Sequence, residues 1–282
     1  MTAMPELPEV ETMRRCIAPV AGLSIARVWR PRGKLQSIRF VPSWREVCAG
    51  LQGRLITEVA RLGKRLVLRL DNSNRLVIEP RMTGLVMMAA PPDRSHLRLV
   101  VELQGRRAGK LLFWDQRGLG VVHLLTETVF ARQFGPGRIG PDALTVSEEE
   151  FAARLRDSSR PIKVALLDQK RLAGIGNLYA SEMLHRARIH PATACRQIAG
   201  NQWVRLWKSM RAVLAEAIDH QGTTLRDGTY RIAADEPGNH QHHLRVYQRD
   251  GEPCLQCRRE RIVRIVQAQR STFFCPRCQA AR

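Results

Sequence analysis

The sequence lacks the long apolar run that a membrane-spanning helix needs, because no stretch of its 282 residues approaches about 18 uninterrupted apolar positions. It also lacks a secretory signal, since the segment from Met1 to Arg14 is acidic and proline-rich. No internal repeat or low-complexity tract is present. We therefore expect a soluble, intracellular protein that works in the cytoplasm.

Acidic residues are scarce relative to basic ones. Asp and Glu number 26 against 46 Lys and Arg, which gives a formal net charge of +20. This charge is spread along the whole chain, so a polyanion is the natural partner. Membrane lipid is the rival polyanion, but the missing apolar run favours nucleic acid. We expect the protein to bind it as a monomer.

Cysteine is also sparse, and three of the seven cysteines, Cys16, Cys48 and Cys195, stand far apart. Isolated cysteines of this kind are typical of small core residues, so we assign them no chemistry.

The other four cysteines form two CxxC pairs that are 17 residues apart: Cys254, Cys257, Cys275 and Cys278. This spacing can place four thiolates around one zinc ion. Four thiolates fill the coordination shell and leave no position for water, so the zinc is expected to be structural. The alternative is a disulfide-linked tail, although nothing else in the chain indicates an oxidising compartment.

The segment around the cysteine pairs is strongly basic. Six arginines oppose the single Glu260: Arg258, Arg259, Arg261, Arg264, Arg270 and Arg277. The pattern predicts a zinc-bound β-hairpin whose cationic surface suits phosphate.

The rest of the chain changes its hydrophobic period near the middle. A helix is expected to open at Pro8 and close before Gly22. Two-residue alternation then predicts strands of an antiparallel sandwich or barrel at four places: 65–70, 75–79, 97–103 and 111–114. The residues 71–74 favour a turn.

Three glycines and two prolines between Phe134 and Pro141 predict a domain boundary, after which the signal is helical. Helices are expected after the capping pair Ser147 and Glu150, from Pro161 to Gly174, after Asn177, and over 202–220. The segment 226–243 has no period and is expected to be a mobile loop.

The sequence 169–182 predicts two helices joined by a turn that contains Gly174 and Gly176. Backbone N–H groups at the start of the second helix, together with the Asn177 amide, suit a phosphate. A purely structural helix junction is the alternative. The segment is no Walker loop, because Lys-Ser/Thr does not follow its last glycine.

Six motifs occur in an order that resembles one family, the formamidopyrimidine-DNA glycosylases with the related endonuclease VIII. The motifs are Pro5 to Thr12, Gly63-Lys64, Met82-Thr83-Gly84, Asp115 to Arg117, Gly174 to Glu182, and the cysteine hairpin with Gln269 to Cys275. The resemblance covers nearly the whole chain, from Pro5 to about Gln279.

This resemblance implies an α+β multidomain fold. An N-terminal antiparallel β-sandwich is expected over 5–134, a helix–two-turns–helix domain over 142–244 and a zinc finger over 245–282. Double-stranded DNA with oxidised bases or abasic sites is the implied partner, bound between the domains.

The resemblance also implies a bifunctional DNA glycosylase and abasic-site lyase of base excision repair. Pro5 would attack C1′ of the damaged nucleoside through its secondary amine and form a Schiff base, followed by β- and δ-elimination. Glu6 would act as the proton donor and acceptor. Lys64, Asn177 and Arg270 would hold the phosphates beside the lesion, and Arg270 would also assist the second elimination.

An extruded base leaves a gap in the duplex. In the family, residues that match Met82, Arg117 and Leu119 fill this gap, and the arginine reads the partner base. His96 is assigned to DNA binding by the same resemblance. Arg117 favours oxidised purines, such as 8-oxoguanine and formamidopyrimidines, over oxidised pyrimidines. For Met82, an ordinary core position is the alternative.

The chain departs from the family pattern at four places. Leu119 replaces an aromatic residue, and Glu79-Pro80-Arg81 replaces His-Leu-Gly, with Pro80 expected to alter the strand locally. The segment 226–243 matches poorly. Finally, Met1 to Ala3 precede the expected nucleophile, so we expect translation to start at Met4 and this methionine to be removed.

Besides an enzyme of this type that prefers oxidised pyrimidines, two other functions remain open from the sequence. The first is a catalytically silent protein that binds damaged DNA with Pro5 blocked. The second is a zinc-ribbon RNA-binding or transcription factor, which leaves the Glu6 and Lys64 motifs unexplained.

Overall fold

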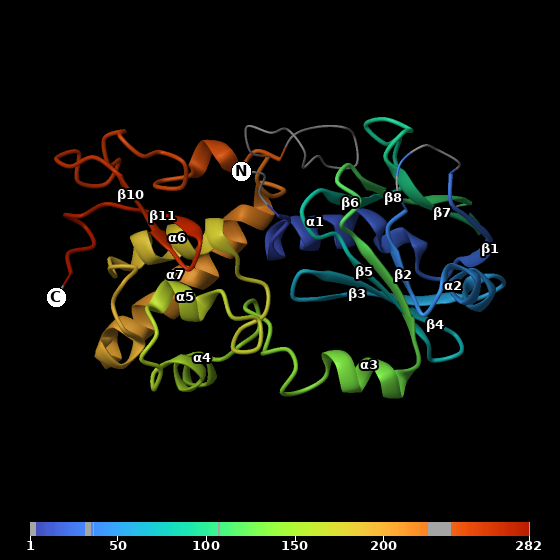
Figure 1. Ribbon diagram of the computed structural model, residues 1–282, viewed down its shortest axis with the longest axis horizontal. Coiled ribbons are helices and arrows are strands. Elements are labelled where there is room, and N and C mark those ends of the chain that lie inside the picture. The colour runs from blue at the N-terminus through green and yellow to red at the C-terminus, as the bar shows by residue number, and fades with distance from the viewer. Residues whose placement is uncertain (1–3, 32–34, 36, 107, 225–237, 282) are drawn as a thin grey trace. The chain divides into compact units, whose positions relative to one another are not determined.

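The computed structural model describes residues 4–31, 35, 37–106, 108–224 and 238–281 (Figure 1). The chain divides into two compact units. Unit 1 is Met1–Pro136 with His220–Gln241, and unit 2 is Gly137–Asp219 with His242–Arg282. Among the described residues, no helix combines the length and the apolar character needed to cross a membrane.

Unit 1 contains two β-sheets. The four-stranded sheet has the order β1 (Ser24–Trp29), β7 (Leu97–Gln104), β8 (Gly109–Asp115), β6 (Gly84–Met87). The five-stranded sheet has the order β2 (Arg39–Val41), β9 (Val121–Leu125), β5 (Arg75–Glu79), β4 (Arg65–Leu70), β3 (Ile56–Leu62). All neighbouring strands are antiparallel except β2 and β9, which run parallel.

The helices of unit 1 pack on these sheets: α1 (Leu7–Ile17), followed by the 3-10 turn η1 (Ala18–Val20), α2 (Trp44–Leu51) and α3 (Glu127–Phe134). Helix α1 contacts β3 and β4 of one sheet and β6 of the other, and Figure 1 shows it between them. Its buried Val10, Met13 and Ile17 enter the main core, as their helical spacing predicts.

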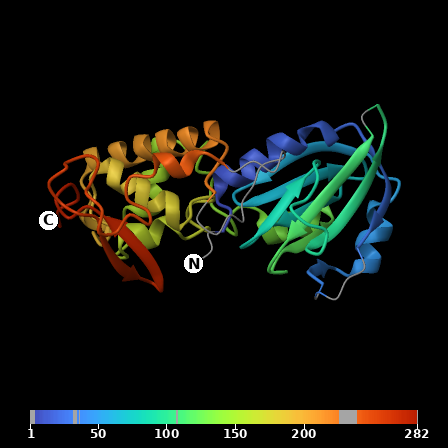
Figure 2. The ribbon, with the colours of Figure 1, turned by 90° about the horizontal axis from the view of Figure 1, so that it is seen from above.

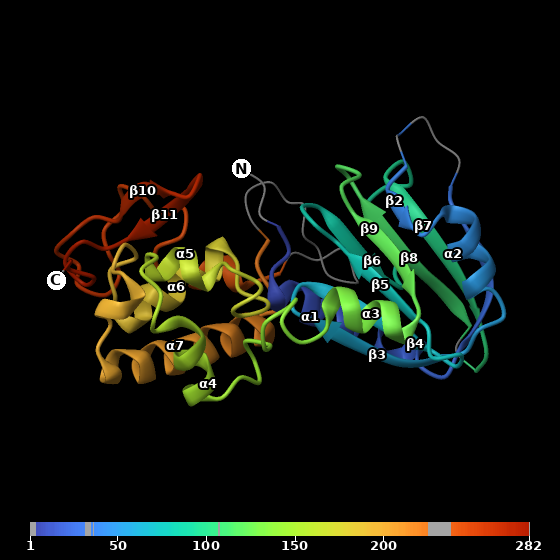
Figure 3. The same cartoon turned by 60° about the horizontal axis from the view of Figure 1, so that its bottom comes forward.

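The alternation of β4 explains how the five-stranded sheet is covered on both faces. Leu66 and Leu68 face the main core. Val67 points to the opposite face, where it packs with Val77 of β5 and Phe130 of α3. Figure 3 shows the ribbon of α3 beside this sheet. Because side chains alternate along a strand, three consecutive apolar residues require cover on both sides.

Unit 2 is built from helices and one hairpin. Its elements are α4 (Glu148–Leu155), α5 (Ile162–Leu166), α6 (Asn177–Ala187), η2 (Cys195–Gln197), α7 (Gly200–Asp219), β10 (Val263–Gln267) and β11 (Arg270–Phe274). The long helix α7 packs on α6, and α6 also contacts β11 (Figure 2). The 3-10 turn η3 (His240–His243) lies where the chain passes from unit 1 to unit 2.

The predicted α+β fold with a sandwich, a helical part and a cysteine hairpin is confirmed, with three local differences. Helices α2 and α3 were not predicted; Ser43 caps α2 by accepting the N–H of Glu46, and Thr126 caps α3 by accepting the N–H of Val129. The helix predicted from Pro161 to Gly174 ends at Leu166, because the Gln169 amide bonds the Gly174 N–H and the Ile175 carbonyl and so holds a turn.

The third difference concerns the predicted loop over 226–243. Residues 226–237 lie outside the described residues. Residues 240–243 form η3, so this end of the segment is a 3-10 turn rather than an irregular loop. Strand β5 ends at Glu79, directly before Pro80.

Candidate active site and nucleic-acid interface

The start of α1 is a closely bonded corner of unit 1. Pro5 is buried, and Glu6, which caps the helix, is only 5% exposed. One oxygen of Glu9 accepts the Glu6 N–H at 2.9 Å, and the other accepts the Thr223 N–H at 2.9 Å. The Glu9 carboxylate therefore fixes the backbone of Glu6, the expected proton donor, and also the backbone of Thr223.

Three turns lie at one end of the unit 1 sheets, and we call this end the three-turn edge: residues 63–64, 80–83 and 116–120. Register places them together. In the five-stranded sheet Leu66 pairs with Ile78, and Glu79 pairs with Val121. In the other sheet Gly84 pairs with Asp115. Lys64, Met82, Arg117 and Leu119 therefore all lie on this edge.

Asp115 joins two of these turns. This fully buried carboxylate accepts the Thr83 hydroxyl at 2.5 Å and the Gly120 N–H at 2.7 Å. The Thr83 oxygen in turn accepts the Arg117 N–H at 2.9 Å. Because the two bonds of Thr83, to Asp115 and to Arg117, cross from the turn 80–83 to the segment 115–120, Met82 and Arg117 are held in a fixed spatial relation.

The side chains on these turns differ in how far they are exposed to solvent. Leu119 is 48% exposed, which is unusual for a large apolar side chain in a turn. Arg117 is exposed and Met82 is half-buried. An apolar pair beside a guanidinium can enter a gap in a base stack and meet a polar base edge.

The third turn is tied to α1 through Arg61. Its guanidinium donates to Glu11 Oε2 at 3.2 Å and to the Gly63 carbonyl at 2.9 Å. Burial acts to raise the pKa of Glu11, but hydrogen bonds from Arg14 and Arg15 outweigh it, so the pKa is lowered. The charged carboxylate thus anchors the turn that carries Lys64.

His96 precedes β7, and its backbone carbonyl accepts the Asp115 N–H at 2.9 Å. Its Nδ1 atom lies 2.9 Å from both Asp93 oxygens. Burial works to raise the pKa of Asp93, whereas hydrogen bonds from Ser95 and His96 lower it and prevail. His96 is therefore oriented by a charged carboxylate beside the Asp115 strand end.

In unit 2, Asn177 and Arg270 belong to connected elements. Asn177 is the first residue of α6, and its Nδ2 donates to the Ser271 carbonyl at 3.0 Å. The amide thus bonds the residue next to Arg270, whereas the sequence suggested that it would face a phosphate. Arg270 is exposed at the start of β11.

A buried lysine strengthens the same junction. Lys163 of α5 is 1% exposed, and its ammonium donates to the Ser271 carbonyl at 3.0 Å and to the Thr272 hydroxyl at 2.8 Å. A buried ammonium is tolerated only with such partners. The hairpin strand that carries Arg270 is therefore fixed to the helices of unit 2.

A buried carboxylate holds the segment that leads into the cysteine hairpin. Glu182 of α6 accepts the backbone N–H groups of Arg245, Val246 and Tyr247 at 2.8–3.0 Å. Its burial raises its pKa, against the effect of these three donors.

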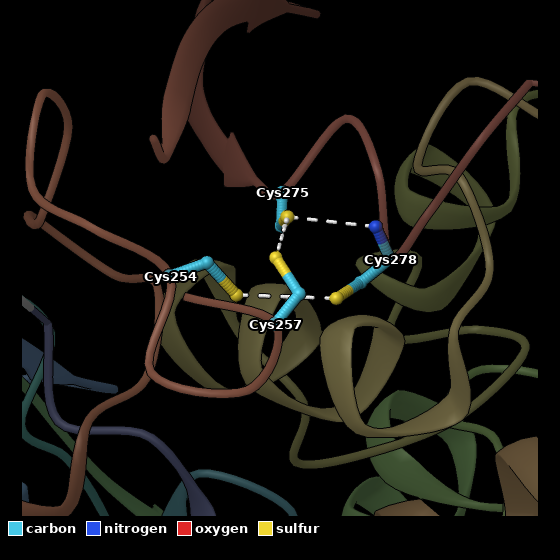
Figure 4. Close-up of side chains that lie close together, drawn as sticks. All are labelled: Cys254, Cys257, Cys275 and Cys278. Atoms are coloured by element: carbon cyan, nitrogen blue, oxygen red, sulfur yellow. Dashed lines mark hydrogen bonds between the residues drawn. The ribbon is translucent and has the colours of Figure 1, made fainter. Parts of the chain in front are cut away.

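The four cysteines of the hairpin form a metal-binding geometry (Figure 4). Their sulfur atoms all lie within 4.8 Å of one another, with 3.9 Å between Cys254 and Cys278 and 3.7 Å between Cys257 and Cys275. A tetrahedron with zinc–sulfur bonds of about 2.3 Å has edges of about 3.8 Å. The sulfur atoms are too far apart for disulfides, so the thiolates fit one structural zinc ion.

The surroundings favour the thiolate form at Cys257, whereas burial raises the pKa of Cys275 and of Cys278, so a bound cation would be needed to hold those two as thiolates. Backbone N–H groups of Arg259 and Glu260 help to lower the pKa of Cys257 to about 6. His185 Nε2 lies 3.5 Å from the Cys254 sulfur. Such donors to metal-bound sulfur are the usual support around a zinc centre.

The sequence assigned no role to Asp115, Lys163, Glu9 or Glu182, although each fixes a turn or strand of the site. Two of them carried a signal. Lys163 interrupts the apolar run 162–166, which indicates a buried and partnered charge. Asp115 ends an apolar strand, but its partners Thr83 and Gly120 become visible only in the fold.

The β-sandwich, the helical unit and the four-thiolate hairpin are the three parts that the resemblance predicts for a zinc-binding DNA-repair glycosylase. Three family profiles match the chain in the same order. The "Formamidopyrimidine-DNA glycosylase N-terminal domain" matches residues 4–122, the "H2TH domain" of the same enzymes matches 139–229, and the "Zinc finger found in FPG and IleRS" matches 251–281.

Individual relatives agree along the full length. The formamidopyrimidine-DNA glycosylase of Chloroflexus aggregans is 43% identical over 98% of both chains. The crystal structure of the MutM (Fpg) protein from Thermus thermophilus superposes with a TM-score of 0.83 at 36% identity, covering 98% of both chains. A complex between Lactococcus lactis Fpg and DNA with an abasic site gives 0.85 at 31%, covering 98% of this chain and 100% of that one.

The chain belongs to the formamidopyrimidine-DNA glycosylase family. The predicted family and the predicted structural zinc are therefore confirmed.

Proposed function

We propose that this protein is a bifunctional DNA glycosylase and abasic-site lyase of base excision repair that acts on oxidised purines in double-stranded DNA. The family and the relatives solved with lesion or abasic DNA support this. The observation that carries the proposal is the corner of α1, where a buried proline precedes a buried glutamate whose backbone is fixed by Glu9.

In the proposed reaction, the Pro5 nitrogen donates its lone pair to C1′ of the damaged nucleoside. The bond between C1′ and the base breaks, and the base leaves with that electron pair and a proton. The nitrogen then loses its N–H proton and the C1′–O4′ bond breaks, with O4′ taking the electron pair of that bond and a proton, so that an iminium forms between the nitrogen and C1′. The iminium acidifies C2′, so loss of a C2′ proton expels the 3′ phosphate, and a second elimination expels the 5′ phosphate. Glu6 transfers protons beside this nitrogen.

The other proposed roles follow the two units. Lys64, Asn177 and Arg270 bind phosphates beside the lesion, and Arg270 assists the second elimination. Met82, Arg117 and Leu119 fill the gap left by the extruded base, with Arg117 reading its partner, and His96 supports DNA binding at the same edge. We also retain as proposals the three-domain division 5–134, 142–244 and 245–282, and a cytoplasmic location.

The chemistry requires Pro5 to be the chain terminus, because a proline nitrogen within a peptide bond has no available lone pair. We propose that translation starts at Met4 and that this methionine is removed. The match to the N-terminal family profile begins at residue 4, which supports this start.

The test compares two forms of the protein, one that begins at Pro5 and one that retains Met4. Each is incubated with duplexes that carry 8-oxoguanine, a formamidopyrimidine, thymine glycol or an abasic site, with and without borohydride. We expect the first form to release oxidised purines most rapidly and to become covalently linked to DNA. Binding without cleavage or linkage by both forms would instead identify a catalytically silent DNA-binding protein.

A further inference from the structure

Arg81 has a backbone conformation that is unusual for its residue type. Its φ angle is 56°, in the left-handed region that glycine occupies without steric cost and other residues rarely adopt. The turn that holds it is closed by a hydrogen bond from the Gly84 N–H to the Pro80 carbonyl at 2.9 Å. Strained positions of this kind often have a functional reason.

The Arg81 side chain belongs to a charge cluster around Glu79. This carboxylate is 7% exposed and lies 3.0 Å from His123 Nε2, 3.3 Å from Arg81 Nη2 and 3.5 Å from Arg65 Nε. Burial acts to raise the pKa of Glu79, but hydrogen bonding to His123 and the two arginines lower it, so the group is ionised. One negative charge therefore faces two guanidinium groups.

The two guanidinium groups differ in their exposure. The Arg65 side chain is 21% exposed and lies 5.0 Å from the centre of the Phe134 ring, which fixes it within the fold. The Arg81 side chain is 51% exposed. The excess positive charge is thus presented to solvent by Arg81, whose planar group has five N–H donors.

Arg81 lies on the three-turn edge, directly before Met82. The strand register brings Lys64 and Arg117 to the same edge. An exposed guanidinium at this place faces whatever occupies the edge, and phosphate is the anion that its geometry fits best.

We propose that Arg81 binds a phosphate of the lesion-containing duplex and that Glu79 orients it for this contact. The inference rests on the proposed function, because it assumes that DNA occupies the three-turn edge. Since a phosphate contact carries no sequence information, Arg81 should strengthen binding equally for different partner bases.

The test uses Arg81→Gly, because glycine fits the left-handed conformation and the variant should therefore fold. Arg69→Ala is the matched control. Arg69 is 49% exposed and pairs with one carboxylate, Glu58, at 3.0 Å, but it lies at the other end of β4, beside the turn to β5. Both variants remove one positive charge from unit 1.

Affinity for a duplex with a tetrahydrofuran abasic analogue is measured between about 50 and 200 mM salt. For Arg81→Gly we expect roughly tenfold weaker binding and a slope of log K against log salt that is smaller by about 0.9, the value of one phosphate contact. Arg69→Ala and Arg81→Lys should keep the slope of the unmodified protein.

The proposal is wrong if Arg81→Gly keeps the salt slope of the unmodified protein, or if Arg81→Gly and Arg69→Ala reduce this slope equally. It is also wrong if Arg81→Gly changes only the preference for the base opposite the lesion. Glu79→Gln tests whether Arg81 only stabilises the fold, because this variant removes the ion pair but leaves the Arg81 charge in place. If Glu79→Gln and Arg81→Gly lower the melting temperature equally and both keep the salt slope of the unmodified protein, the role of Arg81 is structural and the proposal is also wrong. Failure of the unmodified protein to bind or link to abasic DNA would refute the proposed function itself.

Discussion

The three-turn edge of unit 1 and the cysteine hairpin of unit 2 are held in place by opposite means. On the edge, buried carboxylates accept hydrogen bonds from the turns: Asp115 from Thr83 and Gly120, and Glu11 from Arg61. In the hairpin, four thiolates share a cation, and a buried ammonium fixes β11. Protonation of Glu11, whose pKa is lowered in the fold, should therefore weaken the edge, whereas metal removal should weaken the hairpin.

The comparison also separates two tasks. The proposed bond-breaking groups, Pro5 and Glu6, lie at the head of α1 in unit 1, whereas the proposed phosphate-binding groups are separate from them and come from both units, such as Lys64 of unit 1 and Arg270 of unit 2. A protein arranged in this way should lose chemistry and affinity independently.

The largest expected effect is on chemistry. Glu6→Gln removes the proton-transfer group and should slow base excision by about 1000-fold in single-turnover assays. Affinity for abasic DNA should stay unchanged, because the glutamine can still cap α1. An equal loss of affinity would show that the two tasks are not separate.

The next effect is on affinity. Removal of zinc with a chelator, or Cys278→Ser, should loosen the hairpin and weaken DNA binding on the order of 100-fold, as the loss of two charge-assisted contacts would do. Fluorescence anisotropy measures the affinity, and restored zinc should rescue the chelated protein but not the variant. Retained affinity in a zinc-free protein would contradict the assigned role of the hairpin.

A smaller effect is expected at the junction of the turns. In Asp115→Asn, the side-chain amide N–H₂ must face either the Thr83 hydroxyl or the Gly120 N–H, both of which donate to Asp115 in the fold. The lost hydrogen bond should lower the free energy of unfolding by about 2 kcal/mol. Urea denaturation measures the loss. Thr83→Val leaves the Gly120 bond intact and should therefore cost less; the reverse order would refute the proposed coupling through Asp115.

The smallest effect concerns pH. The pKa of Glu79 is lowered from 4.5 in the fold, so its contribution to stability is present above pH 4.5 and is lost as the pH falls through the folded value. We expect stability to be lost on acidification, and to a smaller extent in Glu79→Gln. Denaturation of both proteins at neutral and acidic pH checks this, and identical losses would exclude Glu79.

Local patterns were sufficient for much of the fold. The cysteine spacing predicted the metal geometry because each CxxC pair is a short, self-contained turn. The apolar spacing of α1 and the alternation of β4 predicted their buried faces. Helix α2 was missed because its eight residues lie within a region of strand-like alternation.

The site was harder to predict from the sequence, because the hydrogen bonds that hold it join residues far apart in the chain. Glu9 meets Thr223, and Lys163 meets Thr272. Each residue alone is an ordinary charge in a helix, and only packing reveals the partner. The resemblance supplied candidate residues, whereas the contacts that hold them came from the structure.

The central claim is that one secondary amine, at the head of α1, performs the reaction. After borohydride reduction of the complex with abasic DNA, protease digestion and mass spectrometry can locate the attached sugar remnant. We predict that it lies on the nitrogen of Pro5 in a peptide that begins with this residue. A remnant on a lysine side chain, such as Lys64, would contradict the account.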